Sequence, residues 1–476
     1  MSLLDGLYIL NILVAIVIIF VERKRPSATV AWIMILFALP GAGLVLYVIF
    51  SQLLARYRLH NLSSYMQMKD NPYLLEQKTR MREGVFHYAN AQTAAWSSVI
   101  RFNQEYAGAY LTQNNDIQVF SDGRKAFEAM FADLKNAKHT INIEFFIMKP
   151  DEVGREFIKI LTQKAKEGLK VRLLLDAMGC RRMRQRHFKE LRAAGGEVVF
   201  FFPARVFKLD LKLNYRNHRK LMVIDNEIGY IGGLNAAKEY AGDSKRFGGW
   251  RDTHLRVRGG CVFDIDNRFI MDWNFANGQG ISLDITDYPA DVRGKTAVQI
   301  VSCGPERDET EIKFAYLKLI NSAKHSVYIQ SPYMVPDESI FEALKTAALT
   351  GVDVRIMIPK LPDHPFVYWV TYQNVGELAR YGAKIYIYDK GFLHAKTITV
   401  DDEAASVGSA NFDIRSFELN FESNAFIYDR EVAMQLRHLF EEDIKDSRRL
   451  TVEQYERRSS WIKIKESVSR LLTDIL

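Results

Sequence analysis

The chain has little cysteine: only Cys180, Cys261 and Cys303 occur among its 476 residues, far apart and odd in number. They provide neither a disulfide framework nor the CxxC spacing of a metal site, so we expect three reduced thiols. The composition also lacks the bias of a disordered or collagen-like chain, because 48% of residues are hydrophobic and 25% are charged. Basic residues outnumber acidic ones by only 64 to 57, a mild bias towards anionic partners such as phospholipid or nucleic acid.

Two apolar segments open the chain. Residues 28–50 form 23 positions without a charge, long enough as a helix to exceed the roughly 30 Å hydrocarbon core of a bilayer. The 16 uncharged positions 6–21 are shorter than a usual span. A cleaved signal peptide is the alternative for residues 1–21, but the basic residues 23–25 follow the apolar run and no small-residue cleavage site appears. We therefore predict an N-terminal transmembrane helical hairpin, whose orientation stays open because basic residues flank the second segment on both sides.

A buried core helix is the alternative for residues 28–50, and Pro40 would kink it. The rest of the chain reads as soluble, with charges spread throughout.

The soluble part contains an internal duplication. After a polar helical stretch to about Asn115, strand-like apolar runs alternate with helical ones, the order of a layered α/β domain. Three segments recur in the same order at offsets of 186, 183 and 186: residues 137–143 in 323–329, 168–173 in 351–356, and 196–200 in 382–386. The recurrence predicts two copies of one domain, joined through the polar residues 278–295.

Each copy carries the same cluster of polar residues. The first has His218, Lys220 and Asp225 in the pattern HxKxxxxD, and the second has His394, Lys396 and Asp401. Fourteen residues after each His a GxxN pattern begins, ending in Asn235 or Asn411. A lone HxK in a strand usually means nothing, but a doubled pattern in the same place of an internal repeat is a strong signal.

The spacing also predicts geometry. His and Lys two residues apart on a strand project from the same face. Each strand meets a polar turn and then resumes, which predicts a hairpin with His218 opposite Asn235 and His394 opposite Asn411. Imidazole, ammonium and carboxamide groups would then gather into a set that binds and attacks phosphate. We group Asp225 and Asp401 with the catalytic residues because they complete the motif, although at the turn we expect them to fix the hairpin more than to touch substrate.

The doubled HxKxxxxD with GxxN resembles the phospholipase D superfamily, whose members build one active site from two copies. The two apolar segments and several further stretches resemble the bacterial cardiolipin synthase family: residues 151–157, 250–254, 328–333 and 411–416. The resemblance covers nearly the whole chain. It implies an α/β fold of two tandem phospholipase D-like α/β/α sandwich repeats, packed as a pseudo-dimer behind the N-terminal hairpin.

The resemblance also implies roles for individual residues. His218 is assigned as nucleophile and His394 as general acid and base, although the symmetry of the motifs leaves the opposite assignment open. Lys220 and Lys396 would neutralise the phosphate, and Asn235 and Asn411 would donate hydrogen bonds to its oxygens. Asp252 and Glu422 match the acidic residues that pair with the histidines; ordinary solvated carboxylates are the alternative. With two ammonium groups present, no metal or other cofactor is expected.

The implied reaction transfers a phosphatidyl group from one phosphatidylglycerol to another through a phosphohistidine, giving cardiolipin and glycerol. The partners would be these lipids in a bacterial cell membrane, with no nucleic acid and with homo-oligomerisation left open. The alternatives are a phospholipase D that uses water, a phosphatidylserine synthase that needs a cytidine diphosphate lipid, and a membrane-tethered nuclease.

These inferences divide the chain into five parts: a two-helix membrane anchor at 1–58, a helical linker at 59–112, the repeats at 113–290 and 291–447, and a C-terminal amphipathic helix at 448–476. The last part has apolar residues at helical spacing, including Trp461, Ile464 and Val468. We expect this helix to dock against the protein's own core.

Overall fold

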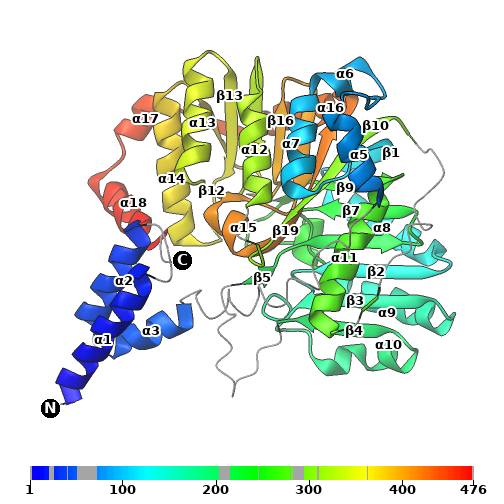
Figure 1. Ribbon diagram of the computed structural model, residues 1–476, viewed down its shortest axis with the longest axis horizontal. Helices are drawn as coiled ribbons and strands as arrows, with labels where there is room; N and C mark the ends of the chain where they lie inside the picture. The colour runs from blue at the N-terminus through cyan, green and yellow to red at the C-terminus, as the bar shows by residue number, and fades with distance from the viewer. Residues whose placement is uncertain are drawn as a thin grey trace.

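The computed structural model describes residues 3–20, 26–39, 41–50, 72–202, 215–244, 246–278, 280–281, 294–307, 310–361 and 363–473. Within them the chain builds one continuous sheet of 16 strands with helices on both faces (Figure 1). The order across the sheet is β4-β3-β2-β6-β7-β9-β1-β10-β19-β17-β16-β11-β13-β14-β20, and β5 pairs with β19.

The first half of the sheet comes from the first predicted repeat. Its strands are β1 (Thr112–Phe120), β2 (Thr140–Phe145), β3 (Lys170–Asp176), β4 (Glu197–Phe201), β5 (Arg216–Asn217), β6 (Lys220–Ile224), β7 (Ile228–Gly232) and β9 (His254–Arg258). The second half contains β10 (Thr296–Cys303), β11 (Ser326–Gln330), β13 (Asp353–Pro359), β14 (Lys384–Tyr388), β16 (Thr397–Val400), β17 (Ala404–Gly408), β19 (Asn420–Tyr428) and β20 (Ser447–Leu450).

The halves meet at the antiparallel pair β1 and β10, where Thr112 lies opposite Val298. Outward from this seam, the order β9-β7-β6-β2-β3-β4 on one side matches β19-β17-β16-β11-β13-β14 on the other. The three recurring sequence segments form or lead into β2 and β11, β3 and β13, and β4 and β14. The predicted duplication and α/β class are therefore confirmed, and the copies join edge to edge into one sheet.

Helices cover both faces. One face carries α8 (Gly123–Asn136), α9 (Glu152–Lys166), α12 (Glu311–Asn321), α13 (Glu338–Leu349) and α14 (Pro365–Arg380), and the other carries α11 (Cys261–Asn277) and α16 (Arg430–Lys445). Asp residues cap the N-termini of α9, α13 and α16 by accepting backbone N–H bonds, as helix starts require. Under α11 and α16 a single hydrophobic core crosses the seam, joining Val257 of one half to Val298 and Ile427 of the other.

The helical linker comprises α5 (Pro72–Arg82), α6 (Ala91–Ala95) and α7 (Ser97–Ala107), and α7 packs on α12 and β10. The predicted domain boundaries at 58/59 and 290/291 fall outside the described residues, so these boundaries stay predictions.

The N-terminal segments differ from the prediction. Residues 28–50 do not form one helix: α2 (Pro26–Ala38) and α3 (Ala42–Phe50) are separate, and α1 (Leu3–Phe20) packs beside α2. Pro40 has no backbone N–H to donate, and Gly41 adopts a left-handed φ of 83°, so the helix cannot continue. Among the described residues, no helix combines the length and apolarity that crossing a bilayer demands. The predicted hairpin therefore stays a prediction, and the alternative of a buried core helix does not fit, because Val30, Met34 and Val45 are exposed.

The C-terminal part forms α17 (Val452–Glu456) and α18 (Ser460–Thr473), and α18 packs on α14. The expectation that this helix would dock on the protein is met by that packing, but its apolar side does not face inward. Glu466 and Ser469 are buried instead, while Trp461, Ile464 and Val468 are exposed. A helical period predicts an amphipathic helix, but it does not tell which face the fold will bury.

Candidate active site

Two short strands carry the motif histidines across the boundary between the repeats. β5, just before His218, pairs in parallel with the start of β19 in the second repeat, and the His218 N–H donates to the Phe421 carbonyl (3.0 Å). In the same way β15 (Phe392–Leu393), just before His394, pairs with β8 (Trp250–Arg251) of the first repeat. There the His394 N–H donates to the Arg251 carbonyl (2.7 Å). Each repeat thus delivers its His to the other repeat.

Each His meets a carboxylate from the opposite repeat. His218 Nδ1 lies 2.9 and 3.0 Å from the two carboxylate oxygens of Glu422, and His394 Nδ1 lies 2.6 Å from Asp252 Oδ2. All four residues are buried. Because a carboxylate accepts, Nδ1 carries the proton and the lone pair falls on Nε2. The structure brings together the pairs that the resemblance implied.

Burial controls the charge of these groups. Desolvation lowers the pKa of His218 to about 4, with Glu422 opposing it and Lys220 adding to it. Desolvation also lowers the pKa of His394 to about 4, with Lys396 adding to it and Asp252 opposing it. Both imidazoles are therefore neutral near pH 7 when no ligand is bound.

The two motif lysines share this environment. Desolvation lowers the pKa of Lys220 to about 7 and that of Lys396 to about 8, and each lysine also depresses the histidine of the opposite motif. Each Nζ donates to the carbonyl of its own motif histidine. Two desolvated cations this close, with Glu422 and Asp252 as the acids that compensate them most, make a site that is completed by an anion.

The asparagines lie differently from one another. Asn235 is held by the protein: its Oδ1 accepts from the Ile147 N–H (2.9 Å) and its Nδ2 donates to the Tyr240 hydroxyl (2.8 Å). The buried Oδ1 of Asn411 has no hydrogen-bond partner among the described residues. One asparagine is thus tied into the scaffold, and the other retains an unsatisfied polar atom beside the second motif.

The predicted hairpin register is wrong by one residue. Leu221 pairs with Ile231 and Thr397 with Val407, so His218 does not face Asn235 directly, nor His394 Asn411. The cause is a loop of three residues in each hairpin, beginning with two left-handed residues: Asp225 and Asn226 in one (φ 53° and 54°), Asp401 and Asp402 in the other (φ 54° and 59°).

Asp225 and Asp401 lie at these turns, away from the histidines by the length of a strand, roughly 20 Å. Each carboxylate accepts three consecutive backbone N–H groups, from residues 138–140 for Asp225 and 324–326 for Asp401, at 2.7–2.8 Å. Grouping them with the catalytic residues is therefore corrected: they fix the hairpin to the start of the neighbouring strand, the role expected from their position at the turn.

Sequence reasoning missed the residues that hold Glu422. Its oxygens accept from the Ser409 hydroxyl (2.5 Å) and the Asn420 amide (3.1 Å). Burial opposes ionisation, but His218, Lys220 and the Ser409 hydrogen bond together lower the pKa of this carboxylate. Ser409 is the second residue of the second GxxN pattern, and the matching position in the first pattern is a glycine. This difference between the two copies was the sequence signal that could have found Ser409.

Gly233 is that matched residue, and it has a different task. A Cβ atom there would lie 2.0 Å from Asp252 Oδ1. A glycine is required for the carboxylate to reach His394.

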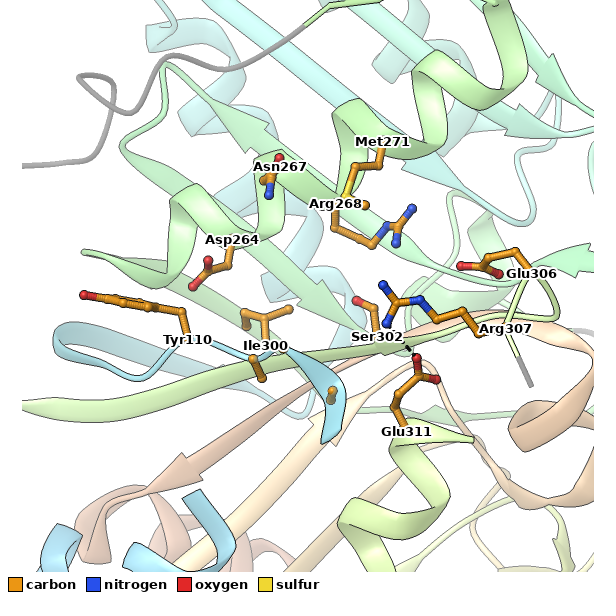
Figure 2. A pocket seen from close by; sticks show the side chains of 13 residues that line it. Tyr110, Asp264, Asn267, Arg268, Met271, Ile300, Ser302, Glu306, Arg307 and Glu311 are labelled. Atoms are coloured by element: carbon orange, nitrogen blue, oxygen red, sulfur yellow. Dashed lines mark hydrogen bonds and ion pairs between the residues drawn. The ribbon is translucent and has the colours of Figure 1, made fainter. Parts of the chain in front are cut away.

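A polar cavity lies behind the first motif (Figure 2). Its lining includes Tyr110, Asp264, Asn267, Arg268, Glu306 and Glu311. Two contacts connect it to the site: Arg268 pairs with Asp272 (2.7 Å), which pairs with Arg219 (2.6 Å), and Ser302 bonds to Ser423 (2.7 Å). Desolvation raises the pKa of Asp264 to about 8. None of the predicted site residues lines this cavity, so it is separate from the histidine cluster.

Comparison with known proteins agrees with this geometry. A family model described as "Cardiolipin synthase, PLD-like domain" matches residues 130–244 and 316–444, and one described as "Phospholipase_D-nuclease N-terminal" matches residues 9–52. The chain is 46% identical over 476 residues to the major cardiolipin synthase ClsA of Bacillus subtilis (strain 168), covering 100% of this chain and 99% of that protein. It is 43% identical over 478 residues to a cardiolipin synthase of Staphylococcus aureus (strain Mu50 / ATCC 700699), covering 100% and 97%.

Among solved structures, the phosphatidylserine synthase of Haemophilus influenzae Rd KW20 matches with a TM-score of 0.62 and 14% identity, over 80% of this chain and 100% of that one. At that identity the likeness shows the fold alone.

Proposed function

This chain belongs to the cardiolipin synthase family of the phospholipase D superfamily, and we propose that it transfers a phosphatidyl group from one phosphatidylglycerol to another, giving cardiolipin and glycerol. The observation that carries the proposal is the crossed pairing of the histidines. His218 with Glu422 and His394 with Asp252 form one site from both repeats, and two lysines lie in the same site. These groups supply the nucleophile, the general acid and base, and the positive charge that two in-line displacements at one phosphorus require.

In the first displacement, Nε2 of His218 attacks the phosphorus of phosphatidylglycerol. An N–P bond forms, the bond from phosphorus to the glycerol headgroup oxygen breaks, and His394 gives that oxygen a proton as glycerol leaves. Glu422 accepts the Nδ1–H of His218 and so stabilises the positive charge that the ring acquires.

In the second displacement, neutral His394 takes the proton from the glycerol hydroxyl of a second phosphatidylglycerol. The hydroxyl oxygen attacks phosphorus, the N–P bond breaks, and cardiolipin is released. The energy of the first phosphodiester is conserved in the phosphohistidine, so the transfer needs no further co-reactant.

The pKa values fit this sequence. A neutral His218 is the form that attacks, and its pKa of about 4 provides it. His394 must be protonated when glycerol leaves, and the bound phosphodiester anion favours that form, because it adds negative charge to a site holding two ammonium groups. The same anion raises the pKa values of Lys220 and Lys396 and so keeps both charged around the phosphoryl oxygens.

The lipid substrates require access to a membrane. We propose that α1 to α3 anchor the chain in the bacterial cell membrane, because many apolar side chains on them are exposed, Leu13, Phe20 and Met34 among them. The two-pass topology stays a prediction, since α2 has 13 residues and a span needs about 20. Labelling of single cysteines placed before α1 and after α3, with a reagent that does not cross the membrane, tests it.

The test of the activity supplies purified protein in detergent micelles with phosphatidylglycerol as the sole phospholipid, with chelator present, and resolves the products by mass. Cardiolipin and free glycerol in equal amounts are expected. Phosphatidic acid as the sole lipid product would make water the acceptor and the protein a phospholipase D. Turnover only with a cytidine diphosphate lipid and serine would indicate a phosphatidylserine synthase, and turnover only of DNA would indicate a nuclease.

A further inference from the structure

The C-terminal helix α18 turns its apolar side away from the protein. Trp461, Ile464 and Val468 follow one another at helical spacing and form a stripe with exposed fractions of 64%, 52% and 48%. A helix on the surface of a globular protein normally buries such a stripe. Two things then need an explanation: which contacts hold α18 in this orientation, and what covers its outward apolar stripe.

Polar contacts fix this orientation. Glu466 and Ser469, each only 2% exposed, form the buried side of α18. Arg458 Nε lies 2.9 Å from both carboxylate oxygens of Glu466, and the Lys465 ammonium lies 4.8 Å from the ring centroid of Trp369 on α14. A partly buried ion pair, in which one guanidinium N–H is shared by both carboxylate oxygens, holds the helix more firmly than an exposed pair would. The stripe is therefore held outward by the fold.

The charges beside the stripe are basic. Lys463 is exposed and Lys465 is half-buried, while Glu466, the acid between them, is neutralised by Arg458. Lysines flanking an apolar stripe are the arrangement of helices that lie in the headgroup region of anionic membranes.

The stripe also lies at the end of the molecule that carries the proposed membrane anchor. Figure 1 shows α18, in red, at the same end of the long axis as α1 to α3, in dark blue. Those helices carry the other large group of exposed apolar side chains. The two exposed apolar surfaces thus share one side of the protein, away from the cavity of Figure 2 between α11, β10 and α12.

We propose that α18 lies in the surface of an anionic bilayer, with Trp461, Ile464 and Val468 among the acyl chains and Lys463 and Lys465 at the headgroups. With the N-terminal helices it forms a second contact that holds the catalytic repeats at the membrane. The proposal rests on the proposed function only in taking its substrate lipid as the occupant; lipid contact itself can be measured without turnover.

The first test measures lipid contact in the full-length protein reconstituted into phosphatidylglycerol–phosphatidylcholine vesicles. Single cysteines, Ile464→Cys and Val468→Cys, are labelled with an environment-sensitive fluorophore, and Ala132→Cys, exposed on α8 at the opposite end of the molecule (Figure 1), is the matched control. The native cysteines are buried and do not compete for label. Lipids brominated on the acyl chain should quench the first two labels strongly and the control weakly, and aqueous iodide should do the reverse.

Three results would overturn the proposal. Strong iodide quenching at Ile464→Cys and Val468→Cys would mean that the stripe faces water. Protection from both quenchers would mean that protein covers it, and a disulfide-linked dimer through Ile464→Cys would identify a second copy as the occupant.

The second test separates this surface from the catalytic function. Ile464→Glu and Val468→Glu should each lower the turnover of long-chain phosphatidylglycerol in vesicles by about tenfold, because a charge cannot enter the acyl region. Turnover of a monomeric short-chain phosphatidylglycerol should be unchanged, and Ala132→Glu, on the exposed side of α8, should match the parent protein on both substrates. Equal vesicle activity in all variants would overturn the surface proposal and leave the enzyme assignment intact. Failure to form cardiolipin from either substrate would overturn the enzyme assignment, and the quenching result would still stand.

Discussion

Each motif histidine pairs with a carboxylate of the opposite repeat, Glu422 or Asp252, but the residues beside the two histidines in the chain differ. His218 lies between Asn217 and Arg219, which are buried and polar. Arg219 donates to Asp272, to Ser423 and to two backbone carbonyls, and Asn217 donates to the buried Glu144. Burial, together with the charge of Asp272, raises the pKa of Glu144 well above its usual value.

His394 lies between Leu393 and Ala395, which pack in an apolar cluster with Met357 and Tyr388. The residue at the place of Glu144 is Gln330, which donates to Asp443 (2.8 Å). The comparison shows which residues the chemistry requires. The motif His, Lys and Asn are the same residue types in both copies, whereas the residues that alternate with them differ, because each packs against a different set of neighbours.

The largest effect on activity is expected from removing either motif histidine, and it should be the same for both. His218→Ala and His394→Ala should each lower phosphatidyl transfer by about 10⁴-fold or more, because a nucleophile or its acid partner cannot be replaced by the other histidine. The initial rate of cardiolipin formation checks this, with the exposed His438→Ala as a control that should keep the parent rate. A variant of either motif histidine that retained the parent rate would contradict a site shared between the repeats.

The polar side of the comparison predicts a difference in stability. Arg219→Met should lower the free energy of unfolding by about 3 kcal/mol or more, because it removes a buried cation from Asp272 and leaves buried acceptors unsatisfied. At the matching position, Ala395→Gly should cost about 1 kcal/mol. Denaturant unfolding of both variants measures the difference in the free energy of unfolding. Equal losses would show that the ion pairs around Arg219 stabilise the fold no more than the apolar packing around Ala395 does.

The asparagines should separate activity from stability. Asn411→Ala should lower kcat by about ten- to a hundredfold with little change in unfolding, because its buried Oδ1 has no partner among the described residues to lose and the family resemblance assigns its amide N–H to the phosphoryl oxygens. Asn235→Ala should lower the free energy of unfolding by about 1–3 kcal/mol, since the Ile147 N–H and the buried Tyr240 hydroxyl lose their partner. Loss of stability at Asn411 with full kcat would reverse this reading.

The smallest effect is on pH dependence. The motif lysines must be charged to bind the phosphate, and their pKa values of about 7 and 8 place the loss of charge in the free enzyme there. We expect kcat/KM to fall as pH rises through about 7 to 8, and also to fall as pH drops towards 4, where His218 becomes protonated. A profile that stays flat to pH 10 would mean that the lysine charges do not govern binding.

Much of this architecture follows from the sequence, for physical reasons. The duplication could be predicted because strands β2, β3 and β4 and their counterparts keep the same apolar pattern. The motifs could be recognised because phosphate chemistry permits few residue types. The hairpin register could not be predicted, because it depends on Asp225 and Asp401 adopting left-handed backbone angles that a turn-forming sequence allows but does not require. The network around Arg219 could not be foreseen either: Ser423 of the second repeat reaches it only after the two repeats have packed together, and Asp272 reaches it from α11 of the same repeat, 53 residues along the chain.

The orientation of α18 could not be foreseen for a similar reason. A helical period gives the apolar stripe, but Glu466 and Arg458 decide which side is buried, and that ion pair spans eight residues and a turn.

The most direct test of the shared site is to trap its covalent intermediate. Protein is mixed with phosphatidylglycerol, quenched in alkali to preserve a phosphoramidate, digested and read by mass spectrometry, for the parent protein and for His394→Ala. The account predicts a phosphatidyl adduct on the peptide containing His218 in the parent protein, and none on the peptide containing His394. An adduct on His394, or cardiolipin formation with no adduct on either histidine at any time, would contradict it.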